Sequence, residues 1–126
     1  MYKTLEMNGI RFKGLGERNL IIGEPQTLNK LSSSLLDIEH NLCNNVYAPV
    51  VSKFMKTFFS QNASQSIATT QNVLVMSYYR RNEIYYVREV KGKLKATKIF
   101  TKEKYDKYFE ILDAGEVFIN MRKDFK

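Results

Sequence analysis

Cysteine and histidine are nearly absent from this 126-residue sequence, which contains one of each, Cys43 and His40. A single cysteine cannot form an intramolecular disulfide, so the chain suits a reducing compartment. The usual zinc sites are excluded, because they need several cysteine or histidine ligands. Cys43 and His40 lie three residues apart on a predicted helix, but no orienting partner accompanies them. We therefore expect a small buried cysteine and not a catalytic pair.

Long hydrophobic runs are also lacking. No apolar run approaches the roughly 20 residues of a membrane span, and residues 1–6 contain no apolar segment of a signal peptide. We therefore expect no membrane partner and a cytoplasmic location. Hydrophobic residues make up 44% of the chain and charged residues 26%, which excludes extended disorder. Because no catalytic motif or ligand set stands out, we expect one non-enzymatic domain, residues 1–126, without cofactor or metal.

Positive charge is abundant and unevenly placed. The net charge is +7, and residues 78–109 hold ten Lys and Arg against four Asp and Glu. The residues before them, 1–77, hold seven against five. Half of the sixteen Tyr and Phe also fall within 78–109. A basic, aromatic quarter of the chain indicates an anionic partner, either nucleic acid or an acidic protein surface.

Turn and periodicity signals predict the elements of the N-terminal half. Asn8-Gly9 favours a type I′ turn, which predicts an N-terminal hairpin region over 2–22 with a third short strand at its end. Two amphipathic helices should form a helical hairpin over 25–60, since Pro25 and Pro49 suit helix starts. The second helix carries the apolar stripe Val51, Phe54, Met55, Phe58 and Phe59. The polar, uncharged residues 60–71 predict a mobile loop.

The C-terminal half predicts a basic β-meander over 73–100, with turns at 81–82 and 91–92. A helix over 102–114 should follow, capped by Thr101 and ended by Gly115, and then a terminal strand over 116–121. Together these elements predict an α+β fold. We expect a single antiparallel sheet of about five to seven strands, with the helical hairpin inserted between two strand groups and one C-terminal helix.

One apolar stripe has heptad spacing and allows two interpretations. It consists of Leu28, Leu31, Leu35, Ile38 and Leu42. Such a stripe can form a homodimer seam, but it spans only about two heptads. We therefore favour packing onto the chain's own sheet and keep a homodimer as the alternative.

The meander carries the candidate binding residues. A two-residue turn at 91–92 would pair Arg88 with Lys95 and put Lys93 on the same face, whereas a turn one residue later would disperse these cations. Phosphates reward such a surface through counterion release, and exposed rings can stack on bases. The predicted contact residues are Arg80, Arg81, Arg88, Lys93, Lys95 and Lys98 for phosphates or carboxylates, and Tyr78, Tyr79 and Tyr86 for stacking.

Three functions follow from these residues. The leading hypothesis is a small basic nucleic-acid-binding protein, with low sequence specificity because no recognition helix is evident. The alternative is an inhibitor or accessory factor that docks on an acidic protein surface, a type of protein that viruses and mobile elements often encode. The third is a metal-dependent nuclease, since Glu89-Val90-Lys91 matches an E-x-K motif that would favour magnesium. That motif lacks an upstream carboxylate on a neighbouring strand. An explanation without a binding role is that the positive charges on the sheet edge prevent aggregation.

Overall fold

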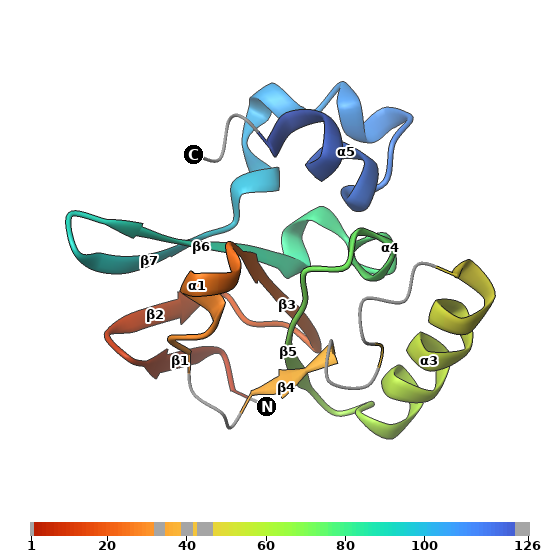
Figure 1. Cartoon of the computed structure of the whole chain (residues 1–126), viewed down its shortest axis with the longest axis horizontal. Coiled ribbons are helices and arrows are strands. Elements are labelled where there is room, and N and C mark those ends of the chain that lie inside the picture. The colour runs from red at the N-terminus through yellow and green to blue at the C-terminus, as the bar shows by residue number, and fades with distance from the viewer. Residues whose placement is uncertain (1, 32–34, 39–41, 43–46, 123–126) are drawn as a thin grey trace.

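A mixed five-stranded sheet organises the computed structural model, which describes residues 2–31, 35–38, 42 and 47–122 (Figure 1). Its strand order is β4-β5-β3-β6-β7. The strands are β3 (Arg18–Gly23), β4 (Leu36–Asp37), β5 (Ser66–Thr69), β6 (Ile84–Val90) and β7 (Lys93–Thr97). All neighbours run parallel except β6 and β7, which are antiparallel. The α+β class is confirmed, but the prediction of a single antiparallel sheet is wrong.

The centre of the sheet explains this difference. In β3, Leu20, Ile21 and Ile22 are all fully buried, because both faces of the strand are covered. Consecutive apolar residues of this kind are typical of parallel strands. β5 lies beside β3 within the segment 60–71, so the predicted mobile loop is wrong there. Small buried side chains such as Ser66 and Ala68 fill little space, which suits a strand between two others.

The predicted N-terminal hairpin is confirmed, although it forms a sheet of its own. β1 (Thr4–Met7) pairs antiparallel with β2 (Ile10–Lys13). The turn residues Asn8 and Gly9 have φ values of 49° and 79°, as a type I′ turn requires. Ile10 and Phe12 are buried and pack on the face of the large sheet that carries Ile21 and Tyr85. The hairpin therefore covers one face of the large sheet.

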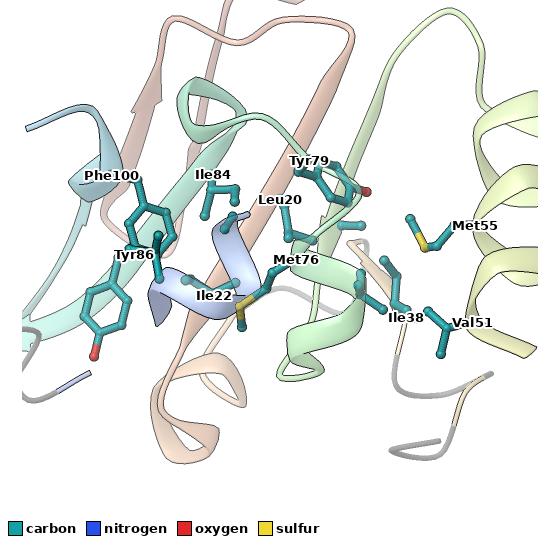
Figure 2. Close-up of a cluster of buried hydrophobic side chains, with 14 of the residues drawn as sticks. Leu20, Ile22, Ile38, Val51, Met55, Met76, Tyr79, Ile84, Tyr86 and Phe100 are labelled. Carbon is teal, nitrogen blue, oxygen red and sulfur yellow. The ribbon is translucent and has the colours of Figure 1, made fainter. Parts of the chain in front are cut away.

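Helices cover the opposite face. α3 (Ala48–Gln61) begins next to Pro49 as predicted, and its Val51, Met55 and Phe58 are buried in the main core (Figure 2). Leu20, Ile22, Ile84 and Tyr86 contribute the sheet side of that core (Figure 2). The alternation of side chains along β3 and β6 thus divides the interior into two apolar clusters. None of the described helices is long and apolar enough to cross a membrane.

The heptad stripe does not form one surface. α1 (Pro25–Leu28) has only four residues, and the chain enters β4 at Leu36. Leu28, Leu31 and Leu35 pack beside the β1–β2 hairpin, whereas Ile38 and Leu42 are buried in the main core. The continuous first helix of the predicted helical hairpin is therefore wrong, because the stripe supplies two separate cores. The homodimer alternative stays a prediction.

The elements predicted around the meander also differ. Residues 73–76 form a short helix, α4 (Val73–Met76), and not a strand, because the Asn72 side chain accepts a hydrogen bond from the Leu74 amide at 2.9 Å. A 3-10 turn, Arg81–Glu83, then leads into β6. The two-stranded β6–β7 ribbon is the part of the predicted meander that forms.

The predicted last helix and terminal strand are wrong. Two 3-10 turns, Glu103–Tyr105 and Tyr108–Glu110, replace the helix over 102–114, and a third, Ile99–Thr101, precedes them. The predicted strand over 116–121 is α5 (Ala114–Met121), whose start is fixed by reciprocal hydrogen bonds between Asp113 and Glu116. Gly115 does not end a helix but lies inside α5, where it packs against the backbone of α4.

Candidate nucleic-acid interface

The β6–β7 ribbon has the register that its turn predicts. Lys91 and Gly92 have φ values of 51° and 76°, so they form a two-residue turn of type I′. Arg88 therefore lies directly opposite Lys95, and Val90 lies opposite Lys93. Residues opposite each other, and residues two apart on a strand, share a face. Arg88, Lys93 and Lys95 therefore form one surface, here called the basic plate.

The basic plate is exposed because the ribbon extends beyond the helical layer. Tyr86 lies on the same face and is 4% exposed, since it packs in the main core. Arg88, two residues further along β6, is exposed to solvent. Figure 1 shows the β6–β7 ribbon projecting past α5 at its turn end. The other face of the ribbon packs on the β1–β2 hairpin through Val87, Leu94 and Ala96, so it holds the plate outward.

Among the described residues, no carboxylate forms an ion pair with the basic plate. None of the ion pairs between described residues involves a plate residue. Glu89 belongs to the opposite face, where its carboxylate lies 2.7 Å from the Lys30 ammonium. Nearer the helices, burial and then the Glu24 carboxylate raise the pKa of Tyr86, which Arg88 partly offsets. The plate thus keeps three exposed positive charges on one side of a ribbon.

Arg81 and Lys98, two of the predicted contact residues, hold the fold together. The Arg81 guanidinium donates to the Phe100 carbonyl at 2.7 Å and lies 2.9 Å from an Asp106 carboxylate oxygen. It also covers the Phe109 ring, 4.6 Å from the centroid. Arg81 therefore has a structural role, since its donors are engaged, and its predicted role in binding stays a prediction.

Lys98 connects the end of β7 to the β1–β2 hairpin. Its ammonium donates to the Gly14 carbonyl at 2.8 Å and lies 5.2 Å from the centre of the Tyr85 ring. This lysine is consequently a structural contact, and the prediction of phosphate binding is not supported. Arg80 is exposed, but it precedes the 3-10 turn at the other end of β6 from the plate.

The predicted stacking residues are mostly inside the protein. Tyr79 is 5% exposed, and its ring meets Phe59 edge-on at a centroid distance of 5.3 Å. Tyr86 is buried as well, so the prediction that these two rings stack on bases is wrong. Tyr78, 37% exposed, follows the C-terminus of α4. None of the three predicted tyrosines therefore offers a ring on the exposed part of the plate.

A groove beside the ribbon was not predicted. It has a volume of about 660 Å³ and lies between the β6–β7 ribbon and the Asn8-Gly9 turn. Its lining residues are Asn8, Gly9, Lys30, Glu89, Gly92, Lys93, Leu94 and Lys95. The sequence gives no signal for it, because it depends on two hairpins far apart in the chain extending side by side (Figure 1).

The geometry gives no support to the metal-dependent nuclease hypothesis. Glu89 of the E-x-K motif is paired with Lys30, and Lys91 occupies the turn. Within the described part of the chain, no group of three His, Cys, Asp or Glu residues could hold a metal ion. Cys43 and His40 lie outside the described residues.

The chemistry of the site therefore reduces to three exposed cations on a rigid ribbon. Such a surface can neutralise phosphates or carboxylates. Comparison with protein-family models, with curated proteins and with solved structures finds no match for this chain.

Proposed function

We propose that this protein binds nucleic acid through the phosphate backbone, without catalysis and with little sequence specificity. The observation that carries the proposal is the ribbon register, which puts Arg88 opposite Lys95 and Lys93 beside them. All three side chains are exposed and none has an ion-pair partner among the described residues. Cations arranged in this way release counterions from a phosphate backbone, which supplies sequence-independent affinity.

Double-stranded nucleic acid is the ligand that the plate suits better. Proteins that bind single strands without sequence preference usually combine charge with exposed aromatic rings. Here the rings near the plate, including Tyr86, are buried, so the plate can bind nucleic acid through its charges but not by stacking. The major groove of B-DNA admits a two-stranded β-ribbon, and the phosphates flank that groove. A projecting ribbon with a cationic face therefore favours a duplex.

An acidic protein surface is the competing partner for the same charges. Duplex DNA presents one negative charge per roughly 1.7 Å of helix axis, a density that protein surfaces rarely reach. The plate puts Arg88 opposite Lys95 and Lys93 only two residues along the same strand, about 7 Å away, which is a comparably dense set of cations. For this reason nucleic acid is the proposed partner of the plate face.

Fluorescence anisotropy with short duplex and single-stranded DNA, each over a salt series, tests the proposal. Three neutralised phosphates predict a slope of log affinity against log salt of about −2.7 for a duplex. Duplex should be bound more tightly than the single strand. Absence of binding at low salt would overturn the proposal, and binding that hardly changes with salt would exclude phosphate contacts as its source.

A further inference from the structure

The outer edge of β7 has backbone groups without a partner strand. In a ribbon closed by a two-residue turn, the residues flanking the turn exchange hydrogen bonds, and so does every second pair beyond them. Val90–Lys93 and Arg88–Lys95 are such pairs. The amide and carbonyl groups of the intervening residue Leu94, and of Ala96, therefore point away from β6. Among the described residues, β7 pairs with β6 alone.

There is room for another chain along this edge. The groove of about 660 Å³ is lined by Lys93, Leu94 and Lys95 of β7, by the turn residues Asn8, Gly9 and Gly92, and by the paired Lys30 and Glu89. Its volume lies within the range of about 300–1,000 Å³ that ligand sites occupy. No hydrogen bond between described residues involves the outward groups of Leu94. An extended segment can therefore reach the edge and use its hydrogen-bonding groups.

We propose that the β7 edge binds an extended acidic segment of a partner protein by strand addition. An added strand would continue both faces of the ribbon, because side chains of paired residues share a face. Its residues beside Lys93 and Lys95 would be acidic, whereas those beside Leu94 and Ala96 would be apolar. The edge therefore selects a strand in which acidic and apolar residues alternate. This inference uses the backbone edge of β7 and shares Lys93 and Lys95 with the basic plate, but it does not rest on the proposed nucleic-acid binding.

A second copy of this chain is a poor occupant of the same edge. Pairing of two β7 strands would place the lysines of one copy next to those of the other, and like charges in neighbouring strands are destabilising. Lysines on edge strands commonly prevent such self-association. Glu89 lies on the opposite face of the ribbon and is paired with Lys30 at 2.7 Å, so it does not offset these contacts. Charge complementarity therefore favours an acidic partner.

Binding of a fluorescent peptide with alternating Glu and Val residues tests the proposal on the full-length protein. We expect saturable binding, and at least tenfold weaker binding of a peptide with Lys in place of Glu. Two further peptides carry N-methyl groups on either the Val amides or the Glu amides. Strand addition uses only one of these two sets, so one methylated peptide should lose binding at least tenfold while the other retains it. Equal effects of both methylation patterns, or no binding of the parent peptide, would overturn the proposal.

A proline variant separates strand addition from plain electrostatic attraction. Leu94→Pro removes an amide that points outward, so the β6–β7 ladder and all three plate charges stay in place. The matched control, Leu94→Thr, keeps the amide. Only the proline variant should lose peptide binding at least tenfold, and both should bind duplex DNA like the parent. If circular dichroism shows that the proline variant does not fold, the two methylated peptides still test strand addition on the parent protein. DNA binding without peptide binding would overturn the edge proposal alone.

Discussion

Arg88 and Lys95 lie directly opposite each other in the β6–β7 ribbon, although both are positively charged and exposed. Like charges in opposite positions of neighbouring strands destabilise a sheet. No described carboxylate forms an ion pair with either side chain. A like-charged pair that lowers stability in this way is expected where the positive charge is needed for binding an anionic partner.

Lys95→Glu should therefore stabilise the fold and weaken DNA binding. The change converts a repulsive cross-strand pair into an attractive one, which should raise the free energy of unfolding by up to about 1 kcal/mol. Urea unfolding measures this effect. The control is Lys93→Glu, which lies opposite Val90 and should change stability by less than about 0.5 kcal/mol. A loss of stability in Lys95→Glu would show that the two cations do not repel each other.

Arg81→Met should destabilise the protein and leave DNA binding nearly unchanged. The guanidinium holds the Phe100 carbonyl and Asp106, and hydrogen bonds to charged groups contribute about 1.5–3 kcal/mol. Because the side chain is partly exposed, we expect a loss near 2 kcal/mol in urea unfolding. Arg80→Met, at an exposed position, serves as the control. If Arg81→Met folds but binds DNA much more weakly, Arg81 itself takes part in DNA binding.

Gly115→Ala should destabilise the contact between α4 and α5. A Cβ atom at this position would lie 2.1 Å from the Val73 carbonyl oxygen, which belongs to the backbone. Overpacking of this kind costs about 1–3 kcal/mol, more than the helix propensity that alanine adds. Gly16→Ala is the control, since nothing lies within 4 Å of its new Cβ. Thermal unfolding should show a lower midpoint for Gly115→Ala only.

Tyr79→Phe should not reduce stability at neutral pH. The Tyr79 hydroxyl is buried and finds no hydrogen-bond partner among the described residues. Its removal leaves no group unsatisfied, so we expect an increase in the free energy of unfolding of up to about 1 kcal/mol. Tyr78→Phe, at an exposed ring, should change little. A clear loss of stability in Tyr79→Phe would mean that the hydroxyl has a partner.

The same substitution should flatten the stability profile at alkaline pH. Burial, and then the Glu83 carboxylate, raise the pKa of Tyr79 above its usual value of 10.0. Above about pH 10 the unfolded chain releases this proton and the native protein keeps it, so stability falls as pH rises. Urea midpoints between pH 8 and pH 11 should decline more in the parent than in Tyr79→Phe. Parallel declines would contradict the raised pKa.

Locally determined features could be predicted from the sequence. The turns at Asn8-Gly9 and Lys91-Gly92 follow from the residues that tolerate positive φ, and the turn at 91–92 then fixes the ribbon register. The helix start at Pro49 is equally local. These signals determine which residues share the basic plate.

Features decided by burial could not be predicted in the same way. The small polar residues of β5 carry no periodic signal and resemble a loop, yet the strand lies between β3 and β4. The burial of Tyr79 and Tyr86 depends on helices that are distant in sequence. One missed feature had a readable signal, since the spacing of Asp113 and Glu116 is that of a capping box.

The central claim is that the position of three cations, and not the net charge of +7, produces DNA binding. The plate variant carries Gln at Arg88, Lys93 and Lys95. The control variant carries Gln at three other exposed cations, Lys53, Lys56 and Lys107. Both variants therefore have the same net charge.

Duplex DNA affinity of the parent and both variants, measured by anisotropy at 50 mM and 200 mM salt, is the most direct test. The parent should lose affinity about 40-fold between the two salt concentrations, as three phosphate contacts imply. The control variant should keep most of this salt dependence and of the affinity at low salt, whereas the plate variant should lose both. Equal losses in the two variants would contradict the account, because net charge alone would then explain the binding.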